Sequence, residues 1–290
     1  MTASKNIAAS VRARLLMRAK EQGMDYNLIL TRYALERLLY RLSVSQWAEA
    51  FLLKGALLFD LWFDQPHRPT RDMDLLGFGS SDMANLVAVF STVCALPHDD
   101  GMVFDPATVR AAEIRKEANY AGVRVTLLGV LDSARCAVQI DVGYGDAVTP
   151  EPERMHYPVL LAGMAAPQIR AYPRYTVVAE KYQAMVSVGM VNARLKDYFD
   201  VWFLAQHAPM DPAVLRQAIT ATFARRGTPL PQSLPMALSD AFAKDPAKEK
   251  QWAAFLTKNK LQAPPLALVA QVLRQLLWES TAQQAIKAKE

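Results

Sequence analysis

The sequence has little cysteine and no long apolar run. Its two cysteines, Cys94 and Cys136, lie in apolar or small-residue surroundings and lack metal-ligand spacing. This argues against a zinc site or a disulfide framework and favours a reducing compartment. No stretch reaches the roughly 18 apolar residues of a membrane span. The first residues run into a charged helix without the apolar segment of a signal peptide. We therefore expect a cytoplasmic protein without membrane contact.

The sequence also lacks the usual signatures of histidine-based catalysis and of dinucleotide binding. Its four histidines are scattered, with no metal-ligand or catalytic partner nearby in sequence. The pair Gly77-Phe78-Gly79 lacks the third glycine of a dinucleotide fingerprint. The chain shows no internal repeat and no low-complexity tract, so a repeat architecture is not indicated.

The composition is that of a globular protein with a slight excess of positive charge. Of 290 residues, 52% are hydrophobic and 21% are charged, which suffices for one large domain or two smaller ones. Thirty-three Lys and Arg against 28 Asp and Glu give a net charge of +5. Such a balance permits an anionic partner, nucleotide or RNA, without requiring one.

Hydrophobic periodicity predicts an α+β protein, with a small mixed sheet between N-terminal helices and a helical C-terminal half. We expect one domain over residues 1–150, with N-terminal helices and the mixed core, and a mainly helical domain over 151–290. The expected helices cover residues 6–22, 25–43, 47–62, 82–96, 177–188, 194–206, 212–224, 234–242, 248–257 and 265–290, and the last of them is expected to fray after residue 281. The expected strands cover residues 70–78, 123–128 and 137–142, with turns at 64–69 and 132–133.

Asp72 and Asp74 are the most informative pair in the chain. On an extended strand, alternating side chains place both carboxylates on one face, about 6–7 Å apart. Their repulsion is about 2–3 kcal/mol at an effective dielectric constant near 20. A divalent cation removes this cost, and hard oxygen ligands suit Mg²⁺ bound together with phosphates. An isolated Asp-x-Asp is more often a solvated strand end, so other residues must decide.

A third acidic residue, Asp141, lies on a neighbouring predicted strand and is followed by Gly143 and Gly145. Glycine at this place permits close backbone approach. Two carboxylates on one strand and a third on its neighbour form the usual metal-holding set of nucleotidyl transfer, in which the third can also help to activate the attacking hydroxyl. We therefore expect Asp72, Asp74 and Asp141 to be metal ligands and catalytic residues.

The helical half contributes further candidates with two possible interpretations each. Lys181 lies on a largely apolar helix stripe, where it either extends its ammonium to water or points at phosphate. Arg194 and Asp197, and likewise Lys196 and Asp200, are spaced as ordinary intrahelical ion pairs.

Taken in order, five runs resemble the nucleotidyltransferase toxins of the AbiEii/AbiGii type, including the MenT toxins. The runs cover residues 51–57, 68–75, 140–146, 180–181 and 194–200. The resemblance extends over residues 28–206 and depends on the order and spacing of the runs.

The resemblance implies a polymerase-β-like nucleotidyltransferase core and the toxin half of a toxin–antitoxin pair, with a cognate antitoxin as partner. It implies that Asp72 and Asp74 hold Mg²⁺, that Lys181 contacts the triphosphate of an NTP, and that Asp197 is an essential acid.

Three residues near the metal pair are implied nucleotide contacts. Lys54 and Gly55 stand where the wider superfamily has a glycine-serine element, and Lys54 would supply a charge in place of the missing hydroxyl. Thr70 occupies a hydroxyl position two residues before Asp72, at which some relatives are controlled by phosphorylation.

Three functions are compatible with these residues. The first is transfer of a nucleoside monophosphate from an NTP to RNA, above all the 3′ end of tRNA, which would block translation; here Arg194 and Lys196 would bind RNA phosphates. The second keeps the chemistry but uses a protein or small-molecule acceptor. The third is a non-catalytic binding module with the same fold, which the intact Asp72, Asp74, Asp141 and Lys181 disfavour.

Overall fold

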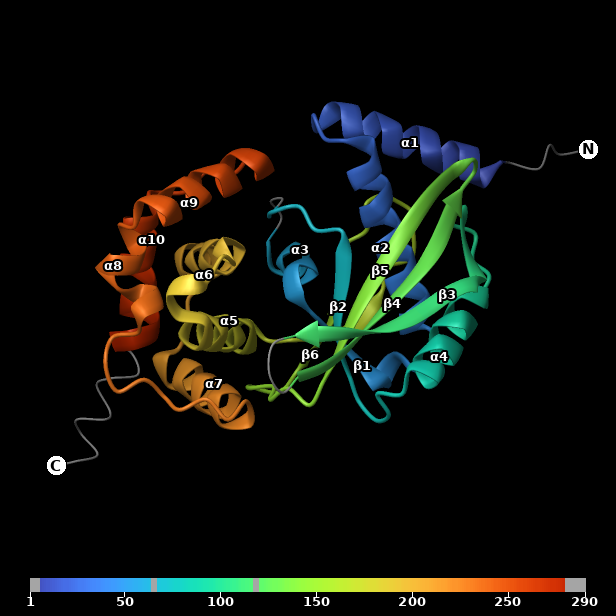
Figure 1. Cartoon of the computed structure of the whole chain (residues 1–290). Helices are drawn as coiled ribbons and strands as arrows, with labels where there is room; N and C mark the ends of the chain where they lie inside the picture. The colour runs from blue at the N-terminus through green and yellow to red at the C-terminus, as the bar shows by residue number, and fades with distance from the viewer. Residues whose placement is uncertain (1–5, 64–66, 117–119, 280–290) are drawn as a thin grey trace, which may run out of the picture. The chain divides into compact units, whose positions relative to one another are not determined.

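The computed structural model describes residues 6–63, 67–116 and 120–279, which belong to two compact units (Figure 1). The first unit is formed by Met1–Gly145 and Glu153–Ala171, and the second by Asp146–Pro152 and Tyr172–Glu290. The expected fraying after residue 281 and part of the turn expected at residues 64–69 lie outside the described residues. Helices around a mixed sheet confirm the predicted α+β class.

Over its described residues, the first unit contains a seven-stranded sheet with the order β3-β4-β5-β2-β1-β7-β6. The central strands β1 and β2 are antiparallel, β2 and β5 are parallel, and β3, β4 and β5 form an antiparallel meander. At the other edge, β7 runs parallel to β1 and antiparallel to β6. The strands are β1 Phe51–Lys54, β2 Asp72–Gly77, β3 Met102–Lys116, β4 Tyr120–Leu131, β5 Ala134–Tyr144, β6 Glu153–His156 and β7 Gln168–Ala171.

Helices of the first unit cover one face of this sheet. The helix α2 packs on β5, α4 packs on β3, and α2 and α4 contact each other (Figure 1). On β5 the buried side chains alternate as Val138, Ile140 and Val142, so the intervening residues point to the opposite face. The helices are α1 Ile7–Glu21, α2 Tyr26–Ser43, α3 Leu58–Trp62 and α4 Met83–Ala95.

The prediction of a continuous helix over residues 47–62 is wrong. Phe51–Lys54 forms the strand β1, and helical structure resumes only at Gly55–Leu57 and α3. The apolar run Phe51-Leu52-Leu53 is buried, as expected of a strand in the middle of a sheet. Such a run lacks the alternation of a half-buried strand, so periodicity does not distinguish it from a helix.

Besides β1, the strands β3, β6 and β7 were not predicted, whereas the strands expected over residues 70–78, 123–128 and 137–142 are present as β2, β4 and β5. β3 contains Asp105, Pro106 and several charged residues, which lower its strand propensity, and β6 and β7 have four residues each. The turn expected at Asp132-Ser133 is present, with Asp132 at a positive φ of 53°. This two-residue connection fixes the register of β4 against β5.

The second unit is helical over its described residues. Its longer helices follow the predicted ranges closely, whereas the range 234–242 divides into a 3₁₀ turn at Met236–Leu238 and the short α8. An aromatic cluster centred on Phe199 contacts Trp202, Phe203, Trp252 and Phe255 and forms part of its core. The helices are α5 Arg174–Val188, α6 Leu195–His207, α7 Pro212–Arg225, α8 Asp240–Ala243, α9 Pro246–Asn259 and α10 Leu266–Leu273.

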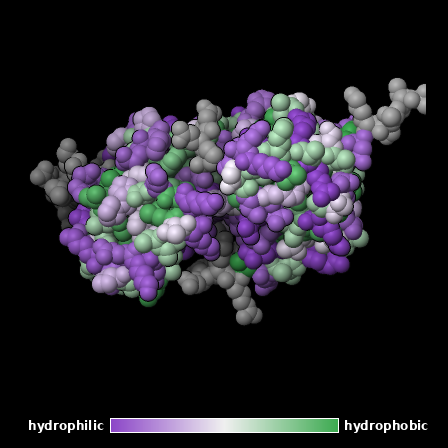
Figure 2. All heavy atoms as spheres, turned by 90° about the horizontal axis from the view of Figure 1, so that it is seen from above, coloured by the Kyte–Doolittle hydropathy of each residue, from purple (hydrophilic) through white to green (hydrophobic). Residues whose placement is uncertain are grey.

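The surface is mixed in polarity. Hydrophilic and hydrophobic residues are interspersed over the face seen in Figure 2. Large apolar side chains that remain exposed, such as Met17, Val103 and Val191, come from elements far apart in the sequence. No helix among the described residues is long and apolar enough to cross a membrane.

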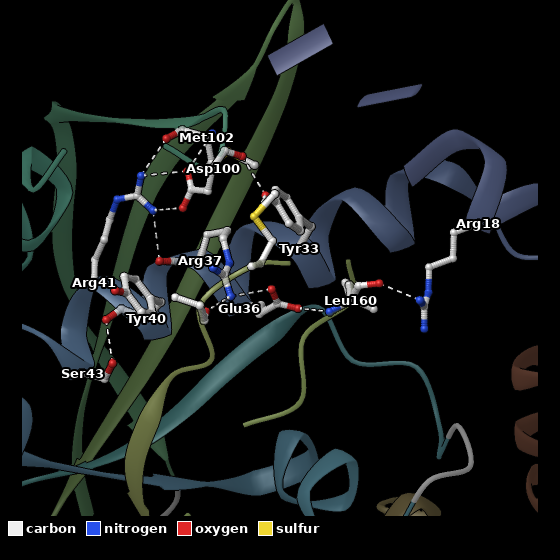
Figure 3. A network of polar contacts seen from close by, with 12 residues as sticks. Arg18, Tyr33, Glu36, Arg37, Tyr40, Arg41, Ser43, Asp100, Met102 and Leu160 are labelled. Atoms are coloured by element: carbon white, nitrogen blue, oxygen red, sulfur yellow. Dashed lines mark hydrogen bonds and ion pairs between the residues drawn. The ribbon is translucent and has the colours of Figure 1, made fainter. Parts of the chain in front are cut away.

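A buried polar network joins α2 to the segment that precedes β7 (Figure 3). Glu36 pairs with Arg37 at 2.7 Å and accepts a hydrogen bond from the Leu160 backbone N–H at 2.6 Å. One turn further on, Arg41 makes a two-bonded ion pair with Asp100. Burial raises the pKa of Glu36 from its ordinary 4.5 to about 7, although Arg37 opposes the shift.

This raised pKa predicts a pH-dependent stability. Because the folded-state pKa is the higher one, the contribution of Glu36 is fully present below about pH 4.5 and is lost as the pH rises through 7. In Glu36→Gln this loss is absent. Relative to wild type, the variant should therefore gain up to about 3 kcal/mol between pH 4.5 and 8. Urea unfolding at several pH values measures the difference. The exposed Glu113→Gln is the control for loss of one carboxylate at the surface. A pH-independent difference in Glu36→Gln would contradict the prediction.

Candidate active site

Four charged residues form one row across the polar face of the sheet. Lys54 on β1 is the register partner of Asp74 on β2, Asp74 is the partner of Asp141 on β5, and Asp141 is the partner of Arg124 on β4. Register partners project from the same face of a sheet. The row therefore places two adjacent carboxylates between two cationic side chains.

Asp72 lies next to this row on the same face. It is two residues from Asp74 on β2, and its register partner is Gln139 on β5. The hydroxyl of Thr70 donates a hydrogen bond to Asp72 Oδ1 at 2.6 Å. Thr70 therefore contacts the first carboxylate of the pair directly, and a phosphate at this hydroxyl would place negative charge beside Asp72.

Gly55 leaves room for Asp74. It directly follows Lys54 and has a positive φ of 76°. A Cβ atom at this position would collide with Asp74 Oδ2 and would lie 2.8 Å from the Cβ of Asp74. Rotation of the Asp74 carboxylate would not relieve the contact with its Cβ. The position thus requires glycine both for its backbone conformation and for the space that Asp74 fills.

The third carboxylate, Asp141, is engaged by an arginine that was not among the predicted site residues. Arg124 Nε donates to Asp141 Oδ1 and Arg124 Nη2 donates to Asp141 Oδ2, each at 2.8 Å. This hydrogen bonding raises the pKa of the Arg124 guanidinium, and the charges of Asp72 and Asp74 act in the same direction. The Asp141 side chain is 9% exposed and that of Arg124 is 43% exposed.

The carboxylate oxygens of this face suit Mg²⁺, but they do not form a complete set of protein ligands. Within residues 6–63, 67–116 and 120–279, no three His, Cys, Asp or Glu side chains are arranged to hold one metal ion. Asp72 and Asp74 offer the hard carboxylate oxygens that Mg²⁺ prefers, and this ion is usually bound by one or two carboxylates together with phosphates and water. Two carboxylates therefore meet the requirement, and both oxygens of the third are bonded to Arg124.

The second unit contains its own cluster of charges, between α5 and α6. Lys181 Nζ lies 2.6 Å from Asp197 Oδ1 and 2.8 Å from Asp200 Oδ2, and both aspartate side chains are buried. Arg194 pairs with Asp197 at 2.9 Å, as the i, i+3 spacing predicted. Asp200, which the spacing paired with Lys196, lies against Lys181. Lys196 itself is on the exposed face of α6.

Arg124, which was not among the predicted site residues, could have been identified from the sequence. A two-residue turn at Asp132-Ser133 pairs Leu131 with Ala134, and counting outward from this pair brings Arg124 opposite Asp141. Alternation with the apolar Val123 and Val125 also places Arg124 on the polar face. The length of the turn thus fixes the register that identifies Arg124 as the partner of Asp141.

Comparison with known proteins decides the family. A family model described as "Nucleotidyl transferase AbiEii toxin, Type IV TA system" matches residues 37–283. The chain belongs to the AbiEii nucleotidyltransferase toxin family. The match covers the sheet with its charged row and also most of the helical second unit. It confirms the resemblance that the sequence motifs indicated and extends it beyond residue 206.

Two solved structures from Helicobacter pylori match the chain. A protein described as a putative nucleotidyltransferase has a TM-score of 0.50 and 17% identity, and the match covers 92% of this chain and 99% of that one. The protein JHP933 has a TM-score of 0.48 and 14% identity, with 91% and 99% covered. No curated protein matches the chain in sequence.

Membership of the AbiEii family makes this chain a nucleotidyltransferase and the toxin component of a type IV toxin–antitoxin system. It therefore implies a nucleotide substrate and an antitoxin partner.

Gly55→Ala should disturb the site more than an alanine at an open glycine does. At Gly55 the variant combines the strain of a positive φ, about 1–2 kcal/mol, with a collision that adds about 1–3 kcal/mol. Gly23, in the same unit, has a φ of 61° and nothing within 4 Å of the added atom, so Gly23→Ala shows the strain alone. Urea unfolding of both variants tests this. Equal destabilisation would show that Asp74 does not restrict residue 55.

Lys181→Met should destabilise the protein strongly, because it leaves Asp197 and Asp200 buried with less positive charge nearby. Removal of one partner from a buried ion pair typically costs about 3–5 kcal/mol. The exposed pair of Lys244 and Asp240 provides the control, and Lys244→Met should cost less than about 1 kcal/mol. Chemical unfolding measures both. If Lys181→Met costs no more than Lys244→Met, the cluster contributes little to stability.

Proposed function

We propose that this AbiEii-family chain transfers a nucleoside monophosphate from an NTP to RNA, with the 3′ end of tRNA as acceptor, and thereby blocks translation. The observation that supports the chemistry best is the charged face of the sheet. Asp72 and Asp74 share one face of β2, and Asp141 lies beside Asp74 in register. In an AbiEii nucleotidyltransferase, such carboxylates are suited to hold Mg²⁺ with the triphosphate.

The proposed reaction is a displacement at the α-phosphorus of the NTP. The oxygen of the acceptor hydroxyl forms a bond to this phosphorus, and the bond to the bridging oxygen of the β-phosphate breaks. Pyrophosphate leaves with that electron pair, and the hydroxyl proton passes to a carboxylate, for which we propose Asp141. Bound Mg²⁺ would offset the negative charge of the triphosphate. In this proposal Asp72 and Asp74 supply the first ligand oxygens, and Asp141 supplies a further one.

The remaining predicted residues keep their proposed roles. Lys54 is the register partner of Asp74, Gly55 borders the Asp74 side chain and Thr70 donates to Asp72, and all three are proposed nucleotide contacts. Lys181 and Asp197 are proposed to be required for activity, Lys181 through its charge toward the triphosphate. Both also form a buried ion pair, so their removal affects stability as well.

RNA as acceptor is supported by charge. The chain has a net charge of +5, and lysine and arginine supply affinity for phosphates regardless of sequence. Arg194 keeps 53% of its side chain exposed although it pairs with Asp197, and Lys196 is exposed on the same helix. We propose that these two residues contact RNA, and that the toxin acts in the cytoplasm, where its tRNA substrate is found.

The proposal predicts Mg²⁺-dependent labelling of tRNA. Purified protein is incubated with total tRNA and each α-labelled NTP in turn, with Mg²⁺ or with EDTA. Label should enter the nucleic-acid fraction with Mg²⁺ only, and Asp72→Asn should lose at least about 100-fold of the rate, since an interaction made in the transition state is removed. Expression of wild type, but not of Asp72→Asn, should arrest bacterial growth.

Three results would contradict this proposal, each in its own way. Label in the protein or small-molecule fraction would show a different acceptor. No transfer to any acceptor, with the protein folded, would favour a binding module. Growth arrest that persists in Asp72→Asn would show that toxicity does not need the carboxylate pair; the melting temperature of the variant serves as the folding control.

A further inference from the structure

The ion pair with Arg124 occupies both oxygens of Asp141, the carboxylate that the proposed reaction needs. The guanidinium uses two nitrogen atoms, Nε and Nη2, on the two oxygens of Asp141, each at 2.8 Å. A two-bonded arginine–carboxylate pair of this kind is directional and holds both side chains in one orientation. While it persists, both oxygens of Asp141 are engaged by an internal cation.

A second residue of β5 holds the guanidinium in the same place. In one orientation the Gln139 amide donates through Nε2 to Asp141 Oδ1 at 3.4 Å; with the amide turned, its oxygen accepts from Arg124 Nε at 3.2 Å and from Nη2 at 3.1 Å, which matches its donor neighbours better. Gln139 and Asp141 are two residues apart and share a face, so the guanidinium lies across both. Gln139 is also the register partner of Asp72. Arg124 is therefore fixed beside the carboxylate pair as well as on Asp141.

The partners differ in how easily they can leave this arrangement. Asp141 is nearly buried and fixed by its strand, whereas Arg124 exposes 43% of its side chain. Water solvates a released guanidinium, whereas a nearly buried carboxylate left alone is unfavourable, so release of Arg124 requires that another cation takes its place at Asp141. The arginine is thus the partner that can rotate away, and the carboxylate stays where it is.

We propose that Arg124 competes with the divalent cation for Asp141. In the cation-free protein the guanidinium neutralises Asp141 opposite Asp74, and the cation displaces it when it binds. Arg124 is then a positioning residue that sets how tightly the cation is held. This inference rests on the proposed function, because it takes Asp72 and Asp74 as the ligands to which the cation binds first.

The test measures binding of Mn²⁺ alone to the NTP-free protein, by electron paramagnetic resonance of the free ion. Arg124→Gln should bind Mn²⁺ about fivefold more tightly than wild type, which corresponds to about 1 kcal/mol. Arg124→Lys keeps the charge but loses the planar fork, so its affinity should lie between the two. The control Arg135→Gln removes the same charge from an exposed position on β5, six residues from Asp141. It should leave the Mn²⁺ affinity unchanged, since the roughly 20 Å of strand between residues 135 and 141 exceeds the screening length.

A double-mutant cycle separates competition for Asp141 from a general effect of charge. Asp141→Asn should weaken Mn²⁺ binding, and in this background Arg124→Gln should bring no further gain. An equal gain in both backgrounds, or no gain in either, overturns the inference. Failure of the proposed function looks different: wild type would then bind no Mn²⁺, or would bind it as tightly in Asp72→Asn. Far-ultraviolet circular dichroism and melting temperature confirm that each variant is folded.

Discussion

Asp74 and Asp141 lie opposite each other because β2 and β5 pair in parallel with a fixed register. Neighbouring strands are about 4.8 Å apart, so the two negative charges are close, and like charges in this position destabilise a sheet. The adjoining strands place a cationic side chain beside each carboxylate, Lys54 next to Asp74 and Arg124 next to Asp141, which reduces this repulsion. Gly55, Thr70 and Gln139 are all arranged around this row. The row is thus the constraint from which the rest of the first unit's candidate site follows.

In the second unit, buried carboxylates pair with a lysine from a neighbouring helix instead of with cations on adjoining strands. Asp197 and Asp200 lie on one face of α6, one turn apart, and a lysine from the neighbouring helix reaches both. Lys181 and the two aspartates are largely closed to water, with 13%, 1% and 0% of their side chains exposed, whereas the arginine on Asp141 exposes 43% of its side chain. A closed cluster stabilises one arrangement, and an open one can exchange its cation. The two clusters therefore suit different tasks within one nucleotidyltransferase.

Local patterns predicted the helices and the carboxylates of this protein, and they failed where pairing between distant segments decides the structure. The alternation in Val138, Ile140 and Val142 and the spacing of Asp72 and Asp74 are properties of single strands, so the sequence displays them. Strand β1 could not be recognised, since burial on both faces removes alternation from Phe51–Leu53. The partner of Asp141 depended on counting across a hairpin, and the short strands β6 and β7 contain too few residues for any pattern to emerge.

The closeness of Asp74 and Asp141 is a property of the folded chain alone. They are far apart in the sequence, so an unfolded chain keeps their charges apart and screened by solvent. In the folded protein the two carboxylates repel each other, although Lys54 and Arg124 reduce the repulsion, and a cation bound between the strands would lower the free energy of the folded state alone. If the proposed cation site forms, the concentration of divalent cations in the cell and the stability of the folded toxin are therefore thermodynamically linked, even without nucleotide.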